Sequence, residues 1–156
     1  MFKLYNSMRS KHILASAIVA VLFVTAFSSP DARAQCKSFV RSGCVPQMKP
    51  YIHDGSNQAV VMYDGEDAEV FKTIFAGQRY RLLICSEVAL PNVEFVVSDN
   101  RRNILFDNRK NGNVQVWDFI SDASQQIKIT IRIPKSQKQE KLVSGCVGVL
   151  FGVLAQ

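Results

Sequence analysis

Residues 68–85 read AEVFKTIFAGQRYRLLIC: two runs rich in apolar, β-branched and aromatic side chains flank the short link Ala76-Gly77-Gln78. Because glycine accepts the positive φ of a tight turn, this link predicts a β-hairpin between two strands. The second run alternates between an apolar and a basic face, with Tyr80, Leu82 and Ile84 opposite Arg79 and Arg81. Such alternation is typical of a strand that is buried on one side.

The rest of the chain repeats this pattern of strand, polar turn and strand. We expect further strands near residues 59–63, 93–97, 104–106, 114–120, 127–133 and 146–154. Turn residues such as Asp64-Gly65 and Asn111-Gly112 separate them, and Asp-Gly is itself a hairpin signal. About eight short strands with turn chemistry between them predict an all-β fold, an antiparallel, jelly-roll-like β-sandwich stapled by disulfides.

Two segments stand apart from the regular strands. No segment has a sustained helical period, and residues 36–51 are expected to be irregular, with room for one helical turn near residues 37–41. The final strand carries large apolar residues on one side and Gly148 and Gly152 on the other. We expect this strand in the middle of a sheet, where a neighbour can approach the glycines closely.

Residues 1–34 have the features of a cleavable signal peptide. Basic residues near the start precede the uncharged stretch 13–27, which is shorter than the about 20 apolar residues of a membrane span. Ala32-Arg33-Ala34 then supplies small residues at the −3 and −1 positions of a cleavage site. The sequence therefore predicts cleavage after Ala34 and a single domain over residues 35–156. We expect an exported protein, periplasmic or secreted, without a stable membrane span.

The basic excess of the chain lies partly in this leader. The whole chain has 19 Lys and Arg against 13 Asp and Glu, but residues 35–156 have 15 against 12. The remaining net charge of +3 gives little support to a nucleic-acid partner.

All four cysteines, Cys36, Cys44, Cys85 and Cys146, lie in the predicted domain. An even number of cysteines in an exported protein predicts two disulfides, with three possible connectivities. We favour Cys36–Cys44 as a local staple and Cys85–Cys146 as a tie between two strands. The alternative is that one pair stays reduced and packs as small apolar side chains.

Three strand motifs carry a resemblance to known domains: Tyr80–Ile84 after Ala76-Gly77, Val93–Asp99, and Ile104–Asp107. Over roughly residues 69–133 this layout resembles bacterial pre-peptidase C-terminal domains and GOLD-type β-sandwiches. The whole predicted domain also resembles small exported β-sandwich proteins of Bacteroidota. The resemblance implies a non-catalytic accessory or binding domain, and it transfers no site residue.

The sequence contains few candidates for catalytic or metal-binding residues. His53 is the one histidine of residues 35–156, and we expect a turn residue there rather than part of a catalytic triad. Asp64, Glu66 and Asp67 cluster in one turn and are weak candidates for a calcium site, since Ca²⁺ prefers oxygen ligands. The same residue types are favoured by the turn itself, so we expect no metal or cofactor.

Two features are weak candidates for a binding surface. Trp117 and Phe119 share one face of a strand, and they would form a sugar or partner platform if exposed and a core pair if buried. Arg101 and Arg102, with Arg109 and Lys110, bracket the strand near residue 104, and Lys135, Lys138 and Lys141 fill the last loop. These basic residues would attract an anionic glycan or lipid headgroup, or they would protect strand edges from aggregation.

The sequence thus predicts an exported, non-catalytic binding or structural β-sandwich module of the cell envelope or extracellular space. Its expected partner is an envelope or extracellular protein or glycan. Two alternatives remain: a thiol-dependent enzyme that uses Cys36 or Cys44, and a calcium-dependent adhesion module.

We expect the intact mass of the exported protein to correspond to a chain that begins at Gln35. Under non-reducing conditions the protein should take up no alkylating group, because all four thiols are oxidised. A lipid-sized addition at Cys36 would contradict the signal-peptide assignment, and uptake of alkylating groups would show free thiols.

Overall fold

The computed structural model describes residues 32–56, 58–135 and 142–155. The predicted leader up to residue 31 and the loop residues Lys138 and Lys141 lie outside the described residues. Within the described part, no helix is long and apolar enough to cross a membrane.

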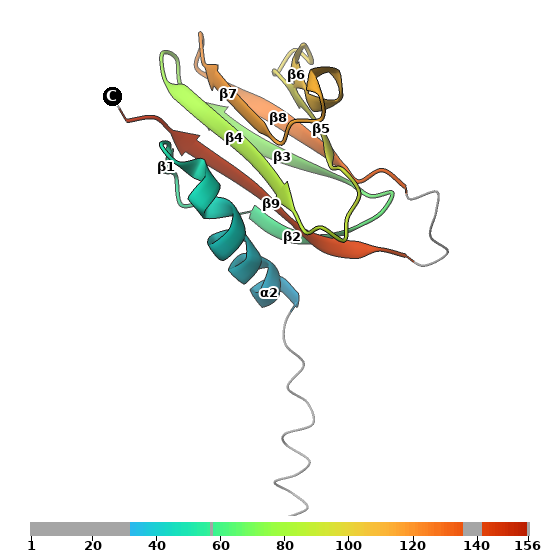
Figure 1. Ribbon diagram of the computed structural model, residues 1–156. Coiled ribbons are helices and arrows are strands. Elements are labelled where there is room, and N and C mark those ends of the chain that lie inside the picture. Colours follow the sequence, from blue (N-terminus) through green and yellow to red (C-terminus); the bar gives the residue numbers. More distant parts are fainter. Residues whose placement is uncertain (1–31, 57, 136–141, 156) are drawn as a thin grey trace, which may run out of the picture. The chain divides into compact units, whose positions relative to one another are not determined.

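The strands form two antiparallel sheets that face each other (Figure 1). In the first, sheet A, the order is β1-β9-β4-β7, and β2 also pairs with β9. Its strands are β1 (Ile52–His53), β2 (Gln58–Tyr63), β4 (Arg79–Ser86), β7 (Val116–Ile120) and β9 (Ser144–Val153). Sheet B has the order β3-β8-β5-β6, with β3 (Asp67–Ile74), β8 (Gln125–Arg132), β5 (Glu94–Ser98) and β6 (Ile104–Asp107). The predicted all-β sandwich is confirmed.

The core between the sheets follows the alternation of the strands. Ile127, Ile129 and Ile131 of β8 are buried, together with Ile133 just beyond the strand. From sheet A, Leu82 and Ile84 of β4 pack into the same cluster. A buried side chain at every second position is what a strand with one face toward a core produces.

The predicted hairpin over residues 68–85 is wrong in its pairing, although both strands are present. β3 pairs with β8 in sheet B, whereas β4 pairs with β7 and β9 in sheet A. Gly77 has the expected positive φ of 76°, but its turn carries the chain from one sheet to the other. The Asp64-Gly65 turn likewise connects β2 of sheet A to β3 of sheet B. The side chains of β3 and β4 therefore meet across the core.

The N-terminal segment is helical, which corrects the expectation of an irregular chain. The α-helix α2 (Ala32–Phe39) continues as the π-helical turn η1 (Val40–Cys44) and the 3₁₀ turn η2 (Val45–Met48). Four side chains at a spacing of four residues are fully or almost fully buried: Cys36, Val40, Cys44 and Met48. In an α-helix, side chains four residues apart differ in direction by about 40°, so such a stripe winds slowly around the helix. The π-helical turn has more residues per turn and reduces this rotation.

Both disulfides join the helical segment to sheet A, so the favoured pairing is wrong. Cys36 is bonded to Cys146 of β9, and Cys44 to Cys85 of β4. Eight residues of helix separate the Cα atoms of Cys36 and Cys44 by about 12 Å, beyond the reach of a disulfide. The loop-entropy model assigns the two observed bonds stabilisations of about 5 and about 4 kcal/mol, because both close long loops.

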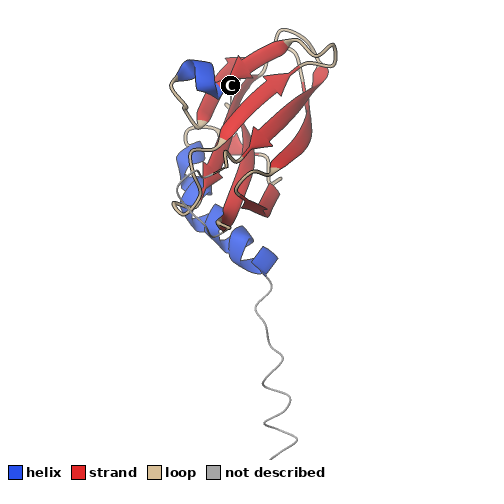
Figure 2. Ribbon diagram, turned by 90° about the vertical axis from the view of Figure 1, so that its right-hand side faces the viewer, coloured by secondary structure: helices blue, strands red, loops and turns tan. Residues whose placement is uncertain are grey.

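The glycines of β9 allow this helix to lie directly on the sheet. The sequence predicted a close approach at these glycines, but not that the neighbour is a helix. A Cβ atom at Gly148 would lie 2.5 Å from Val40 Cγ2, and one at Gly152 would lie 2.7 Å from Met48 Cε. β9 also occupies the expected central position, between β4 on one side and β1 and β2 on the other. Figure 2 shows the helical segment along one side of the strand layers.

Arg81 holds the far end of the helical segment. Its guanidinium donates two hydrogen bonds to the Asp118 carboxylate, at 2.7 and 2.6 Å, and further bonds to the carbonyl oxygens of Gln47 and Lys49. The guanidinium also lies 4.5 Å from the ring centroid of Tyr51. The hydrogen bonds to Asp118 raise the pKa of Arg81 above its usual value, so the guanidinium is charged at neutral pH.

We expect Gly148→Ala to lower the free energy of unfolding by about 1–3 kcal/mol, because the added methyl overpacks the contact with Val40. The measurement is urea unfolding under non-reducing conditions. Gly43→Ala is the control, since its Cβ would meet the Phe39 ring at an ordinary 3.8 Å. It should leave the stability unchanged or raise it by up to about 1 kcal/mol. Equal stabilities of the two variants would contradict the close contact between helix and sheet.

Candidate functional site

The two long sides of the sandwich differ in their chemistry. On the side of β3, the ammonium group of Lys72 pairs with Asp54, which follows β1 of sheet A. Burial raises the pKa of Asp54, but hydrogen bonds from Lys72 and Ser56 outweigh it and hold the pKa below the usual value. An ion pair between the sheets therefore closes this side.

On the opposite side, aromatic rings fill the space between the outermost strands β6 and β7. Trp117 and Phe119 of β7 stack with ring centroids 3.9 Å apart, and Phe106 of β6 lies 5.0 Å from Trp117. Tyr80 stacks on Phe119 at 5.5 Å, and Phe95 lies 5.4 Å from Phe106. These five rings form one ladder that runs from sheet A to sheet B, and we call this side of the sandwich the open edge.

The two sequence-predicted aromatic residues are thus brought together, and their environment lies between the two alternatives. Trp117 and Phe119 are partly buried and pack against the core cluster. Their rings are already stacked on neighbouring rings of the protein, which leaves less free ring surface than a flat sugar-binding platform offers. The ladder therefore contributes to packing between the sheets and also reaches the surface.

Large apolar side chains surround the ladder on both outermost strands and just beyond them. Ile104 and Leu105 of β6 are 60% and 40% exposed, and Ile120 at the end of β7 is 55% exposed. Val114, two residues before β7, is exposed as well. Leu105 is the extra residue of β6 where its register with β5 shifts, and such a bulge redirects a side chain.

A cavity of about 200 Å³ opens at this edge. Its apolar lining comes from Ile74, Leu105, Trp117, Phe119 and Ile120. Ser121, Asp122 and Gln125 line its polar part. A cavity of this size, lined by aromatic and aliphatic groups with a few polar groups, suits one large apolar side chain of a partner.

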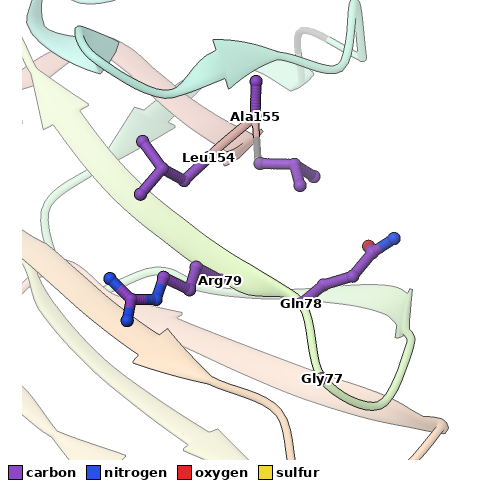
Figure 3. Close-up of a pocket in the computed structure, with 6 residues that line it drawn as sticks. Gly77, Gln78, Arg79, Leu154 and Ala155 are labelled. Atoms are coloured by element: carbon purple, nitrogen blue, oxygen red, sulfur yellow. The ribbon is translucent and has the colours of Figure 1, made fainter.

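A larger hollow of about 620 Å³ lies where β4 begins and β9 ends (Figure 3). It is lined by Gly77, Gln78, Arg79 and residues 153–155. Figure 3 shows Gln78 and Arg79 leaving the chain in opposite directions, as neighbouring residues of an extended chain do. One guanidinium and one amide supply neither a nucleophile nor an acid–base pair, so the open edge remains the stronger candidate.

The predicted basic residues do not join the aromatic ladder. Arg101 and Arg102 lie in the turn between β5 and β6, which Asp99 holds by accepting hydrogen bonds from the backbone N–H groups of Arg101 and Asn103. Arg102 lines a separate hollow on sheet B together with Phe71. Arg109 is bound to the buried carboxylate of Asp107 through two hydrogen bonds.

The three acidic candidates for a metal site each have their own partner. Asp67 accepts two hydrogen bonds from Arg132, which hold the pKa of this carboxyl below its usual value. Glu66 accepts a hydrogen bond from the backbone of Tyr63, and Asp64 from that of Val143. Among the described residues, no group of three or more His, Cys, Asp or Glu could hold a metal ion.

The cysteine candidates for catalysis are excluded by the disulfides. Neither Cys36 nor Cys44 is a thiol, and the chain has no free cysteine, so the thiol-enzyme alternative is wrong. His53 ends β1, and its Nδ1 atom accepts a hydrogen bond from the Gly55 N–H, as suits a residue at a turn.

The comparisons with known proteins give only distant likenesses. No family model and no curated protein matches the chain. The crystal structure of Aeromonas hydrophila PliG, a periplasmic inhibitor of g-type lysozyme, is 14% identical, with a TM-score of 0.46 over 67% of this chain and 89% of that chain. The Salmonella Typhimurium PliG structure is 8% identical, with a TM-score of 0.42 over 63% of this chain and 89% of that chain. A de novo designed double-stranded β-helix is 15% identical over 60% of this chain and 97% of that chain, with a TM-score of 0.27.

At these identities and TM-scores, the likenesses transfer no residue, partner or activity to this chain. The resemblance to pre-peptidase C-terminal and GOLD-type domains stays a prediction.

We call the exposed apolar residues around the ladder the rim of the open edge: Ile104, Leu105, Val114 and Ile120. We expect the rim to be dispensable for folding, in contrast to the ladder. Ile104→Ser should change the free energy of unfolding by less than about 0.5 kcal/mol, because the side chain is mostly exposed. Phe119→Ala should lower it by about 2–4 kcal/mol, because it removes a ring from the core contact. Urea unfolding of both variants measures this difference. A large loss in Ile104→Ser would assign the rim to the core instead.

Proposed function

We propose that this protein is an exported, non-catalytic binding module that contacts a protein partner through the open edge. The observation that carries the proposal is the aromatic ladder, which reaches the surface between two outermost strands that carry exposed Ile104, Leu105 and Ile120. Apolar side chains gathered around aromatic rings are typical of the centre of a protein interface.

The small cavity supports a protein rather than a small-molecule ligand. Its volume of about 200 Å³ lies below the range of roughly 300–1,000 Å³ that drug-sized ligands occupy. A partner can instead insert one side chain there and cover the surrounding apolar rim with the rest of its surface.

Export and the absence of catalysis rest on separate arguments. Two disulfides that fix the N-terminal helix to sheet A suit an oxidising compartment, such as the periplasm or the outside of the cell. The open edge itself carries no histidine or cysteine, and its polar residues offer no paired acid and base.

The test is site-specific photo-crosslinking in cells that express the protein, with p-benzoyl-phenylalanine in place of Leu105. We expect one discrete adduct, whose mass identifies a second protein, and we expect Ile104→Glu to abolish it because a charge cannot be buried in the contact. The matched control carries the same photoreactive group at Val60, an exposed position of β2, which lies at the other edge of sheet A from β7.

No adduct at position 105, or equal adducts at positions 105 and 60, would overturn the proposal. An adduct of twice the monomer mass would show self-association and would also overturn the proposed partner. Turnover that depends on His53 would contradict the non-catalytic assignment.

A further inference from the structure

A third hollow, of about 340 Å³, lies on the outer face of sheet B, away from the helical segment. Its floor follows one row of paired residues across three strands: Phe71 of β3 lies beside Lys128 of β8, and Lys128 lies beside Ser98 of β5. Its polar lining is completed by Glu69, Asp99, Asn100, Gln126 and Arg102. The Asp99 carboxylate is engaged by hydrogen bonds within its own turn. The hollow therefore combines one aromatic ring with hydroxyl, amide and charged groups.

Phe71 is unusual on this face. Its side chain is 55% exposed, while the neighbouring outward positions on β3 are polar: Asp67, Glu69 and Thr73. An exposed phenylalanine does not contribute the favourable free energy that burial of its ring would give. The ring of Phe71 is also not part of the aromatic ladder. An isolated ring within a polar hollow presents a free face for stacking.

Arg102, which lines this hollow, has an unfavourable backbone conformation. Its φ of 68° lies in the left-handed region, which glycine or asparagine occupies far more readily than arginine. Asp99 fixes the turn, because its carboxylate accepts hydrogen bonds from the backbone of Arg101 and Asn103 and from the Asn103 side chain. The turn thus holds an arginine where a glycine would be less strained.

Within the described residues, the positive charge of Arg102 also has no carboxylate partner. Arg81, Arg109 and Arg132 each donate two hydrogen bonds to a carboxylate, whereas within the described residues the guanidinium of Arg102 forms no ion pair. Lys128 on the floor of the hollow is bound to Glu69 at 2.9 Å. Arg102 is therefore the cation of the hollow that is free to receive an anion.

We propose that this hollow binds a hexuronic acid unit of an acidic polysaccharide. A pyranose ring has an apolar face of C–H groups, which stacks on Phe71, and a rim of hydroxyl groups, which Ser98 and Gln126 can bind. The carboxylate of the sugar fits the planar, two-donor geometry of the Arg102 guanidinium. The proposal uses residues separate from the open edge, so it stands or falls independently of the protein-binding function.

The test is isothermal titration of the disulfide-bonded protein with hexagalacturonate, with cellohexaose as the neutral comparison. We expect hexagalacturonate to bind about tenfold more tightly than cellohexaose, the factor that one charge-assisted contact of about 1.4 kcal/mol supplies. Phe71→Ala should weaken binding at least about tenfold, since it removes the stacking surface.

Phe75→Ala is the matched control, because Phe75 is 56% exposed and does not line the hollow. It should leave the affinity for hexagalacturonate unchanged, as should Ile104→Ser at the open edge. No binding of either saccharide, or an equal loss in Phe71→Ala and Phe75→Ala, would overturn the proposal.

Arg102→Gly separates the ligand role from a structural one. We expect this variant to raise the melting temperature, because glycine adopts the positive φ without strain, and to remove the preference for the acidic saccharide. A preserved preference for hexagalacturonate would overturn the assigned role of Arg102. A lower melting temperature would show that the arginine stabilises the turn instead, and it would also overturn that role.

Discussion

The close contact between the N-terminal helical segment and β9 is the constraint on which the rest of the structure depends. Gly148 and Gly152 remove the side chains that would separate the two, so Val40 and Met48 rest directly on the strand. The two disulfides then hold the segment at positions eight residues apart. Because the outer face of sheet A is covered in this way, β9 is buried on both faces from residue 145 to residue 152. The strand surfaces that the helix leaves uncovered include the open edge and the outer face of sheet B.

The sequence predicts the strands well because alternation is a local property of the backbone. The isoleucines of β8 are buried at every second position, as expected from their spacing. Strand pairing is not local. Gly77 adopts the positive φ that its turn requires, but φ specifies only that the chain reverses. Whether the two strands then pair in one sheet or face each other across a core depends on which other strands are available to pair with them. Here β3 pairs with β8, and β4 pairs with β9.

The helical segment was missed because its apolar stripe contains two cysteines. Cys36 and Cys44 alternate with Val40 and Met48 at a spacing of four residues, a helical signal that becomes visible only when cysteine is counted as an apolar residue. The same stripe would have ruled out the local disulfide, since a helix holds its cysteines too far apart. For the open edge, the sequence correctly placed Trp117 and Phe119 on one face. The other rings of the ladder come from three further strands, and no spacing in the sequence identifies neighbours between two sheets.

The arginines show why net charge is a poor guide to a binding surface. Arg81 and Arg132 bind carboxylates on neighbouring strands, Asp118 and Asp67, and thereby join β4 to β7 and β8 to β3. A guanidinium paired in this way has little field left for a ligand, although it counts fully in the net charge. A binding role is indicated instead where a charge stays unpaired and the backbone bears a cost to hold it. Within the described residues Arg102 meets both conditions, because its guanidinium forms no ion pair and its φ is positive.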